Sequence, residues 1–301
     1  MVEEAISVVI PTYNREHVLL ETIGALMSVI DRRTLDLIIV DQSKTHTSTV
    51  SKALSDWEKA RVLRLIKLSK PSVPAAMNRG LISARNEIIL FLDDDIRPEP
   101  GLIDAHLAAH KQTGVALVAG RVIQPWQEGA DRAQFKSFDF ASTQPSWCSD
   151  FMGGNFSINR TVAMALGGFD ENFVAVAYRF ESEFAFRLRQ AGHKIFFEPK
   201  ACVHHLKVPS GGTRTYGQHL RTLQPYHSVG AYYFTLRTWN GWRSMVSLVR
   251  QPFRAIATRH HLKHPWWIPL TLVAEIRGFI WALRLFLRGP KYISESATLL
   301  A

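Results

Sequence analysis

The stretch IILFLDDD at residues 88–95 decides how the rest of the chain is interpreted. Its apolar run, 88–92, is too short for a helix and is typical of a strand buried on both faces of a parallel sheet. Three carboxylates, Asp93, Asp94 and Asp95, follow without a spacer. Because ligands of open α/β sheets bind just outside the carboxyl ends of such strands, we expect a binding site here.

Three adjacent carboxylates repel one another, and burying them is costly unless a positive charge lies between them. A divalent cation that carries a phosphorylated ligand would meet this need, because Mg²⁺ and Mn²⁺ prefer oxygen ligands and keep positions open for phosphate. The alternative is an acidic turn that caps the helix expected from residue 100 onward.

Strand-like runs alternate with segments of helical spacing along the first 200 residues. The expected strands are residues 6–10, 35–40, 62–68, 88–92, 115–122, 151–158 and 194–203, and the expected helices are 15–30, 47–60, 71–85, 100–113 and 179–191. This alternation predicts βαβ units, a mostly parallel sheet flanked by helices, and right-handed crossovers. Residues 124–150 break the pattern and are expected to form a loop.

Composition restricts the class of protein and its compartment. The 301 residues contain two cysteines, Cys148 and Cys202, without the spacing of a disulfide framework or a zinc knuckle. We therefore expect a reducing, cytoplasmic compartment. The acidic start of the chain leads directly into a strand-like run, so we expect no signal peptide.

The charge is distributed unevenly along the chain. Residues 1–199 hold 22 Lys and Arg against 24 Asp and Glu, whereas residues 200–301 hold 14 against two and five of the eight tryptophans. The net charge of the second part is therefore +12, which predicts an anionic partner, either nucleic acid or a lipid surface.

Two segments of this basic part, residues 243–263 and 270–291, have arginines on one helical face and apolar residues on the others. Such helices are typical of a membrane interface, and their charges make them poor spanning helices. The alternative is a helix packed on the first domain with a solvated basic stripe. Pro252 should interrupt or kink the first segment. Because the aromatic residues lie in strongly apolar helices and not on a strand-rich platform, we expect no nucleic-acid partner.

Read together, several motifs resemble family 2 glycosyltransferases of the GT-A fold, over about residues 5–206. The matching segments are VVIPTYNR at 8–15, IIVD at 38–41, NRG at 78–80, FLDDD at 91–95, GGN at 153–155 and GGFDE at 167–171. Gln42 and Met77 depart from the family pattern, which commonly has an acid and an arginine at these positions.

The resemblance implies that a nucleotide-diphosphate sugar lies across the carboxyl ends of the first four strands. Thr12, Arg15 and Asp41 would hold the nucleoside. Asp93 would hold the ribose or the cation, Mn²⁺ or Mg²⁺, and Asp95 would hold the cation, with His204 or His205 beside it. The full set of donor-binding candidates is Pro11, Thr12, Tyr13, Arg15, Asp41, Asn78, Asp93, Asp94, Gly154 and Asn155.

The same resemblance suggests where the catalytic base lies. The family motif E-D-x-[DE]-L-x-x-R-L aligns with residues 180–188, FESEFAFRL, and puts Glu181 at the base position. Glu183 is the alternative, although it falls on roughly the other side of a helix. Both residues could also be ordinary helix-surface acids. His204 and His205 follow the last core strand, where alternation sends their side chains to opposite faces, and the sequence does not choose between them.

We therefore expect a GT-A catalytic domain at residues 1–206, with a nucleotide half to about 122 and an acceptor half from 123, and a basic helical extension at 207–301. The expected activity is inverting, metal-dependent transfer of a sugar to a lipid-linked or cell-surface polysaccharide acceptor. The extension would hold the protein on the inner face of the cell membrane through anionic lipids. The alternatives are a catalytically inactive nucleotide-sugar-binding protein and a nucleic-acid-binding protein that uses the basic tail.

Overall fold

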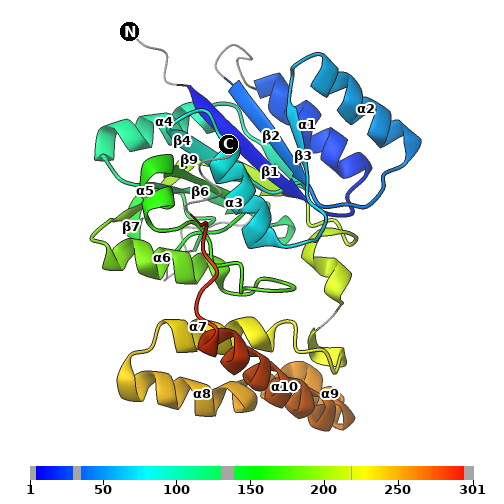
Figure 1. The fold of residues 1–301 in the computed structure, drawn as a ribbon, viewed down its shortest axis with the longest axis vertical. Coiled ribbons are helices and arrows are strands. Elements are labelled where there is room, and N and C mark those ends of the chain that lie inside the picture. Colours follow the sequence, from blue (N-terminus) through cyan, green and yellow to red (C-terminus); the bar gives the residue numbers. More distant parts are fainter. Residues whose placement is uncertain (1–4, 30–34, 130–138, 218, 295–301) are drawn as a thin grey trace.

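The structure is a computed structural model that describes residues 5–29, 35–129, 139–217 and 219–294. Figure 1 shows a sheet flanked by helices, with a second group of helices beside it. The strands are β1 (Ile6–Thr12), β2 (Leu35–Asp41), β3 (Arg64–Lys67), β4 (Ile88–Leu92), β5 (Ile96–Pro98), β6 (Leu117–Ile123), β7 (Ser146–Cys148), β8 (Asn155–Asn159) and β9 (Ile195–His205). The helices are α1 (His17–Val29), α2 (Ser48–Lys59), α3 (Val73–Ser83), α4 (Leu102–Thr113), α5 (Arg160–Ala165), α6 (Phe180–Gln190), α7 (Ser228–Arg237), α8 (Gly241–Ile256), α9 (Arg259–Lys263) and α10 (Ile268–Leu287).

Within the described residues the sheet has the order β3-β2-β1-β4-β8-β6-β9-β5, and β7 pairs with β9. Strands β3, β2, β1 and β4 are parallel, as the alternating pattern predicts, and β6 is parallel to β9. Strand β8 runs antiparallel to both β4 and β6. The carboxyl ends of β1, β2 and β4 therefore meet at one edge, where the acidic triplet follows β4.

Strand β4 lies between two hydrophobic clusters, one on each face of the sheet. Ile89 and Phe91 belong to the cluster under α3, α5 and α6, whereas Leu90 and Leu92 belong to the cluster under α1, α2 and α4. The ring of Phe91 stacks on that of Phe156, with 5.0 Å between centroids. The expectation that this strand is buried on both faces is thus confirmed.

The C-terminal helices form a layer of their own at the lower end of Figure 1, where α7 packs against α10. These two helices approach closely at Gly278, because a Cβ atom there would lie 2.1 Å from the Ser228 hydroxyl. The chain then returns to the sheet, where Glu171 and Ile293 donate main-chain hydrogen bonds to Lys291 and Gly167.

Helix α8 contains Pro252 in its interior and continues to Ile256. Of the two expected effects of this proline, an interruption or a kink, the interruption does not occur. Proline removes one main-chain donor, and the remaining hydrogen bonds carry the 16-residue helix through that position. The predicted segment 243–263 is instead divided between α8 and α9, which begins at Arg259. Among the helices that the structure describes, none has the length and apolarity needed to span a bilayer.

Candidate functional site

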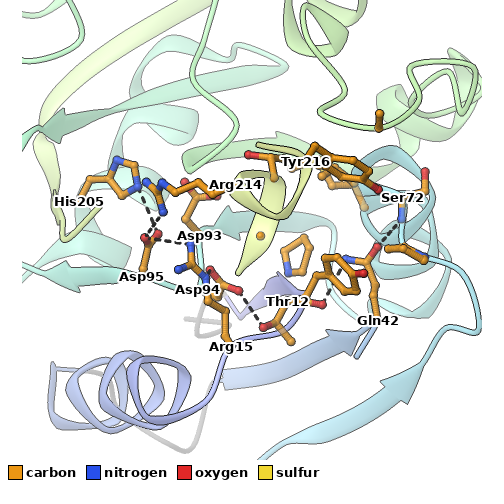
Figure 2. Close-up of a pocket in the computed structure, with 18 residues that line it drawn as sticks. Thr12, Arg15, Gln42, Ser72, Asp93, Asp94, Asp95, His205, Arg214 and Tyr216 are labelled. Carbon is orange, nitrogen blue, oxygen red and sulfur yellow. Dashed lines mark hydrogen bonds and ion pairs between the residues drawn. The ribbon is translucent and has the colours of Figure 1, made fainter. Parts of the chain in front are cut away.

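A cavity of about 160 Å³ lies at the carboxyl ends of β1, β2 and β4. In Figure 2 the three acids gather with Arg15, Arg214 and His205 on one side, and Gln42, Ser72 and Tyr216 lie on the other. The full lining is Pro11, Thr12, Tyr13, Arg15, Gln42, Pro71, Ser72, Val73, Met77, Asp93, Asp94, Asp95, Ala175, His205, Gly212, Thr213, Arg214 and Tyr216. One end of the cavity is therefore charged, and the other is polar and aromatic.

Asp94 is tied to the first strand and the turn after it. The Thr12 hydroxyl donates to its Oδ2 at 2.7 Å, and Arg15 Nε donates to its Oδ1 at 3.1 Å. Burial raises the pKa of Asp94 to about 7, although the Arg15 charge and the Thr12 hydrogen bond oppose this rise. Both carboxylate oxygens thus have protein partners.

Asp95 contacts two arginines and a histidine. Arg15 Nη2 lies 3.1 Å from its Oδ2, Arg214 Nη1 lies 3.2 Å from the same oxygen, and His205 Nε2 lies 3.2 Å from its Oδ1. Burial would raise the pKa of Asp95, but the hydrogen bond and charge of His205, together with the two arginines, lower it overall. This carboxylate is therefore held ionised.

Asp93, Asp95 and His205 form a cluster with the chemistry of a divalent-cation site. One ligand atom from each residue lies within 4.8 Å of the others. Burial, with the charge of Asp95, raises the pKa of Asp93, and a cation would relieve both effects. A Cβ atom at Gly154 would lie 2.3 Å from Asp93 Oδ2, so only glycine permits this approach. Two carboxylates and one imidazole suit Mn²⁺, and the carboxylates also suit Mg²⁺.

A second cavity, of about 470 Å³, adjoins the first and shares Val73, Met77, Asp93 and Thr213 with it. Gly153, Gly154 and Glu181 line this larger cavity. Burial raises the pKa of the partly buried Glu181 to about 8, with smaller contributions from the charges of Asp150 and Asp93. A carboxyl group with a raised pKa, beside the cluster of Asp93, Asp95 and His205, has the properties of a general base.

The loop before Glu181 has a strained backbone. Ala175, Ala177 and Arg179 have φ values of 58°, 51° and 74°, in the left-handed region that glycine normally occupies. Each such residue costs on the order of 1–3 kcal/mol, and such strain is concentrated at functional sites. Ala175 lines the smaller cavity, and the other two line the larger one. The strained loop therefore borders both cavities.

Glu183, the alternative base, has a different environment. It is buried, and its two oxygens accept hydrogen bonds from Arg187 at 2.8 and 2.9 Å. Arg187 also donates to the carbonyl groups of Leu166 and Gly168. Glu183 does not line either cavity, and its contacts are those of a structural ion pair.

Most of the sequence-predicted residues lie together around the two cavities. These are Pro11, Thr12, Tyr13, Arg15, Asp93, Asp94, Asp95 and His205 in the smaller cavity, and Gly154 and Glu181 in the larger one. His204 points to the opposite face of β9, where Glu99 and Glu128 contact it. Of the two histidines, His205 is thus the one in the acidic cluster.

Three further candidates are buried away from the cavity walls. Asp41 is fully buried and contacts Ser43, His46 and Lys67. Burial would raise its pKa, but these hydrogen bonds, led by that from Lys67, lower it overall. Asn78 exchanges two hydrogen bonds of 2.8 Å with the main chain of Phe169.

Asn155 is the third of these residues. Its amide group donates to the carbonyl oxygens of Arg121 and Ala201 and contacts His106 at 3.0 Å. It therefore joins β6, β8, β9 and α4. Its contacts fit a role in holding these elements together.

The segment that follows β9 contributes residues that sequence reasoning missed. Arg214 and Tyr216 lie in the 3₁₀ turn Gly212–Tyr216, and the amide of Gly212 donates to the Tyr13 carbonyl at 2.7 Å. Ser72 and Gln42 are linked by a 2.6 Å hydrogen bond on the opposite wall. The SGG sequence at 210–212 signals a turn, but nothing local indicates that this turn folds back over the strand ends.

Sequence comparison identifies a family and several relatives of this chain. The sequence profile described as glycosyl transferase family 2 matches residues 7–167. The chain is 26% identical, over 156 residues, to the dodecaprenyl-phosphate galacturonate synthase of Rhizobium johnstonii, covering 50% of this chain and 43% of that protein. It is 24% identical, over 212 residues, to the probable glycosyltransferase YdaM of Bacillus subtilis, covering 65% and 49%. The chain thus spans less than half the length of these curated relatives.

Superposition on solved structures identifies the fold of this chain. The mannosyltransferase PcManGT of Pyrobaculum calidifontis, in complex with GDP-Man and Mn²⁺, superposes with a TM-score of 0.57 at 21% identity, covering 94% of this chain and 79% of that one. Residues 1–349 of TarS from S. aureus, in complex with UDP-GlcNAc, superpose with a TM-score of 0.59 at 12% identity, covering 96% and 93%. These likenesses confirm the expected GT-A fold.

Proposed function

The chain belongs to glycosyl transferase family 2, and we propose on this premise that it transfers a sugar from a nucleotide-diphosphate donor to an acceptor hydroxyl. The observation that carries the proposal is the meeting of two cavities at Asp93. One cavity contains the acid and arginine cluster, and the other contains Glu181. The donor would occupy the first and the acceptor the second, so that the reacting atoms meet at their boundary.

The polarity of the smaller cavity supports one orientation of the donor. The diphosphate would lie at the charged end, beside Arg214, because a guanidinium group binds phosphate oxygens in pairs of hydrogen bonds. Arg15, which the resemblance assigns to the nucleoside, lies at this end too, but its guanidinium is engaged by Asp94, Asp95 and two main-chain carbonyl groups. The nucleoside would lie at the other end, between Tyr216 on one side and Gln42 and Ser72 on the other.

Asp93, Asp95 and His205 would hold the divalent cation, Mn²⁺ or Mg²⁺. When bound, the cation supplies positive charge that stabilises the departing nucleotide diphosphate. Arg214 contacts Asp95 from the segment after β9. We infer that this segment closes the cavity around the donor and keeps water from the reacting carbon.

Glu181 would remove the proton from the acceptor hydroxyl as the oxygen attacks the sugar carbon. A single displacement of this kind inverts the configuration at that carbon. The raised pKa of Glu181 favours the role, because a base with a pKa near the working pH accepts a proton readily and is still ionised in part.

The C-terminal layer supports a membrane-bound acceptor. Helix α10 buries mainly small and polar side chains, Thr271, Ala274, Glu275, Gly278 and Ala282, with Leu285. It exposes large apolar ones instead, at Val273, Ile276, Ile280, Leu283 and Leu287. Helix α8 also exposes large apolar side chains, which share one helical face: Trp242, Met245, Val249 and Phe253. Exposed apolar faces beside arginines are typical of helices in a membrane interface.

We propose that residues 207–301 bind an anionic lipid surface on the inner face of the cell membrane. A lipid-linked or cell-surface polysaccharide acceptor would then reach the larger cavity. The arginines of α8 and α10 would contact lipid phosphates, and the apolar faces would enter the interface.

The test is a calorimetric titration of the purified protein with UDP, GDP and dTDP, each with and without Mn²⁺ or Mg²⁺. We expect tight, metal-dependent binding of one nucleotide, and its loss in Asp95→Asn. Asp104→Asn, an exposed acid on α4, is the matched control and should bind like the wild type. If none of the nucleotides binds in the presence of either cation, the proposed function is wrong.

A further inference from the structure

A second group of metal-binding side chains lies behind the proposed catalytic cluster, on the other face of β9. Strands β5 and β9 pair with Ile96 opposite His205 and Arg97 opposite His204. Since side chains alternate along a strand, Cys202 and His204 share one face and His205 lies on the other. The main-chain amide of Glu99 donates to the Cys202 carbonyl at 3.0 Å, which brings Glu99 to the same end of the ladder.

Three ligand atoms converge on this face. The Sγ of Cys202, a ring nitrogen of His204 and a carboxylate oxygen of Glu99 all lie within 4.8 Å of one another. His204 Nε2 and Glu99 Oε1 are only 2.9 Å apart. An unprotonated imidazole nitrogen and a carboxylate oxygen both present lone pairs, so a cation between them, a proton or a metal ion, is required at this distance.

The other ring nitrogen of His204 is placed as in a metal-ligating histidine. Glu128 Oε1 lies 3.1 Å from Nδ1. Histidines that bind metals almost always donate their second N–H to a carboxylate or carbonyl group, which fixes the ring and directs the remaining nitrogen at the metal. Glu128 therefore provides the arrangement that leaves Nε2 free to face Glu99 and Cys202.

We propose that Glu99, Cys202 and His204 bind Zn²⁺ at a site separate from the catalytic cluster. Sulfur, imidazole and carboxylate ligands together suit Zn²⁺, whereas Mn²⁺ and Mg²⁺ prefer oxygen. The catalytic cluster contains no sulfur ligand. The Cys202 side chain is buried, but the Glu99 side chain is 43% exposed and the His204 side chain 19%, so the ion can enter from solvent.

The position of this site suggests its effect on the fold. Asp95 directly precedes β5, and His205 is the last residue of β9. A Zn²⁺ ion bound by Glu99 and His204 would connect the end of β5 to β9 on the face opposite the catalytic cluster. It would thereby fix the distance between Asp95 and His205. The zinc proposal itself rests on the contacts of Glu99, Cys202 and His204 and does not depend on the transfer reaction.

Cobalt substitution tests the proposal on the whole 301-residue chain. Co²⁺ occupies zinc sites, and a bound thiolate gives a charge-transfer absorption band in the near ultraviolet. We expect this band in the wild type and in Cys148→Ser, the matched control, because burial raises the pKa of the Cys148 thiol to about 11. The band should be lost in Cys202→Ser. Co²⁺ in the catalytic cluster gives no such band, because that cluster lacks sulfur.

Three further variants retain Cys202, so they test the site even if Cys202→Ser does not fold. His204→Gln and Glu99→Gln should each weaken Zn²⁺ binding, measured by competition with a chromophoric chelator, by tenfold or more. Glu128→Gln should weaken it by about tenfold, the usual effect of removing a partner of a ligating histidine. Zn²⁺ should also raise the Tm of the wild type more than that of His204→Gln.

Two results would overturn the proposal. The first is the absence of a thiolate band when the wild type is saturated with Co²⁺, which would leave the cluster a hydrogen-bonded ion pair only. The second is a Zn²⁺ affinity that is unchanged in both His204→Gln and Glu99→Gln. Nucleotide titration of the same preparations separates this outcome from failure of the transferase proposal, because the thiolate band and nucleotide binding are measured separately and each can be present without the other.

Discussion

Glu181 is the residue whose ionisation should control the reaction. Only the ionised carboxylate can accept the acceptor's proton, so kcat/KM should rise with pH, reach half of its maximum near the pKa of about 8 and level off above it. A bound cation at Asp93 would lower this value, because the charge of Asp93 contributes to raising it. The measurement is kcat/KM between pH 5 and about pH 9 at a fixed Mn²⁺ concentration. In Glu181→Asp, kcat/KM should still rise with pH but should be lower at every pH. A flat profile for the wild type would contradict the assignment.

Glu183 should affect stability more than nucleotide binding. Glu183→Gln leaves the partly buried Arg187 guanidinium without its charged partner, and we expect a loss of about 3 kcal/mol in the free energy of unfolding. Urea unfolding measures this loss. Glu181→Gln, two residues away, is the control and should lose little stability, since Glu181 forms no ion pair with any residue that the structure describes. A catalytic defect without loss of stability in Glu183→Gln would reverse the two assignments.

A site residue could be predicted from sequence where the neighbouring residues determine its position, and not where a distant segment does. Asp93 and Asp95 follow strand β4 and His205 ends strand β9, and strand ends can be read from sequence, although the choice between His204 and His205 required the structure. Arg214 could not be found in this way, because its contact with Asp95 requires a turn more than 100 residues further along the chain to fold back. Asn78 and Asn155 sit in family motifs, and sequence does not distinguish an amide that binds a ligand from one that binds the main chain.

At the scale of the element, close contact between α7 and α10 should make Gly278 sensitive to substitution. Gly278→Ala places a Cβ atom 2.1 Å from the Ser228 hydroxyl, and we expect a loss of about 1–3 kcal/mol from overpacking. Gly24→Ala is the matched control, because Gly24 lies in α1 with open space around its Cβ position. Alanine there should stabilise the helix by up to about 1 kcal/mol. Thermal unfolding of both variants measures the difference, and equal effects would contradict the packing of α7 on α10.

The element types were predictable where hydrophobic periodicity is strong. The parallel strands β1, β2 and β4 and the helices between them agree with the apolar runs that precede their polar ends. Strand β5 was missed because its three residues are too short to show a period. The antiparallel insertion of β8 between β4 and β6 was not predicted, since strand order depends on packing between distant segments.

For the whole molecule, the basic and apolar layer should bind anionic vesicles. We expect salt-sensitive co-sedimentation with vesicles of phosphatidylglycerol and phosphatidylcholine, and little with phosphatidylcholine alone. Trp242 and Phe253 are 77% and 64% exposed on one face of α8. Replacing both with serine should weaken binding by at least about tenfold, because burial of each side chain is worth roughly 1.5–3 kcal/mol.

The control for the vesicle experiment is Trp147→Ser. Trp147 is 57% exposed but lies on β7, in the sheet. Its replacement should leave vesicle binding unchanged. Equal binding to neutral and anionic vesicles, or tighter binding to single-stranded oligonucleotides than to vesicles, would contradict a lipid surface as the partner.

The most direct test of the account is turnover of donors by the wild type and by Glu181→Gln. UDP-, GDP- and dTDP-sugars are incubated with Mn²⁺ and the released nucleotide is measured, together with the affinity of each protein for that nucleotide. The account predicts release by the wild type, a decrease of about 10²–10⁴-fold in Glu181→Gln, and equal nucleotide affinity in both. Tight nucleotide binding with no release by the wild type, or equal release by both proteins, would contradict it.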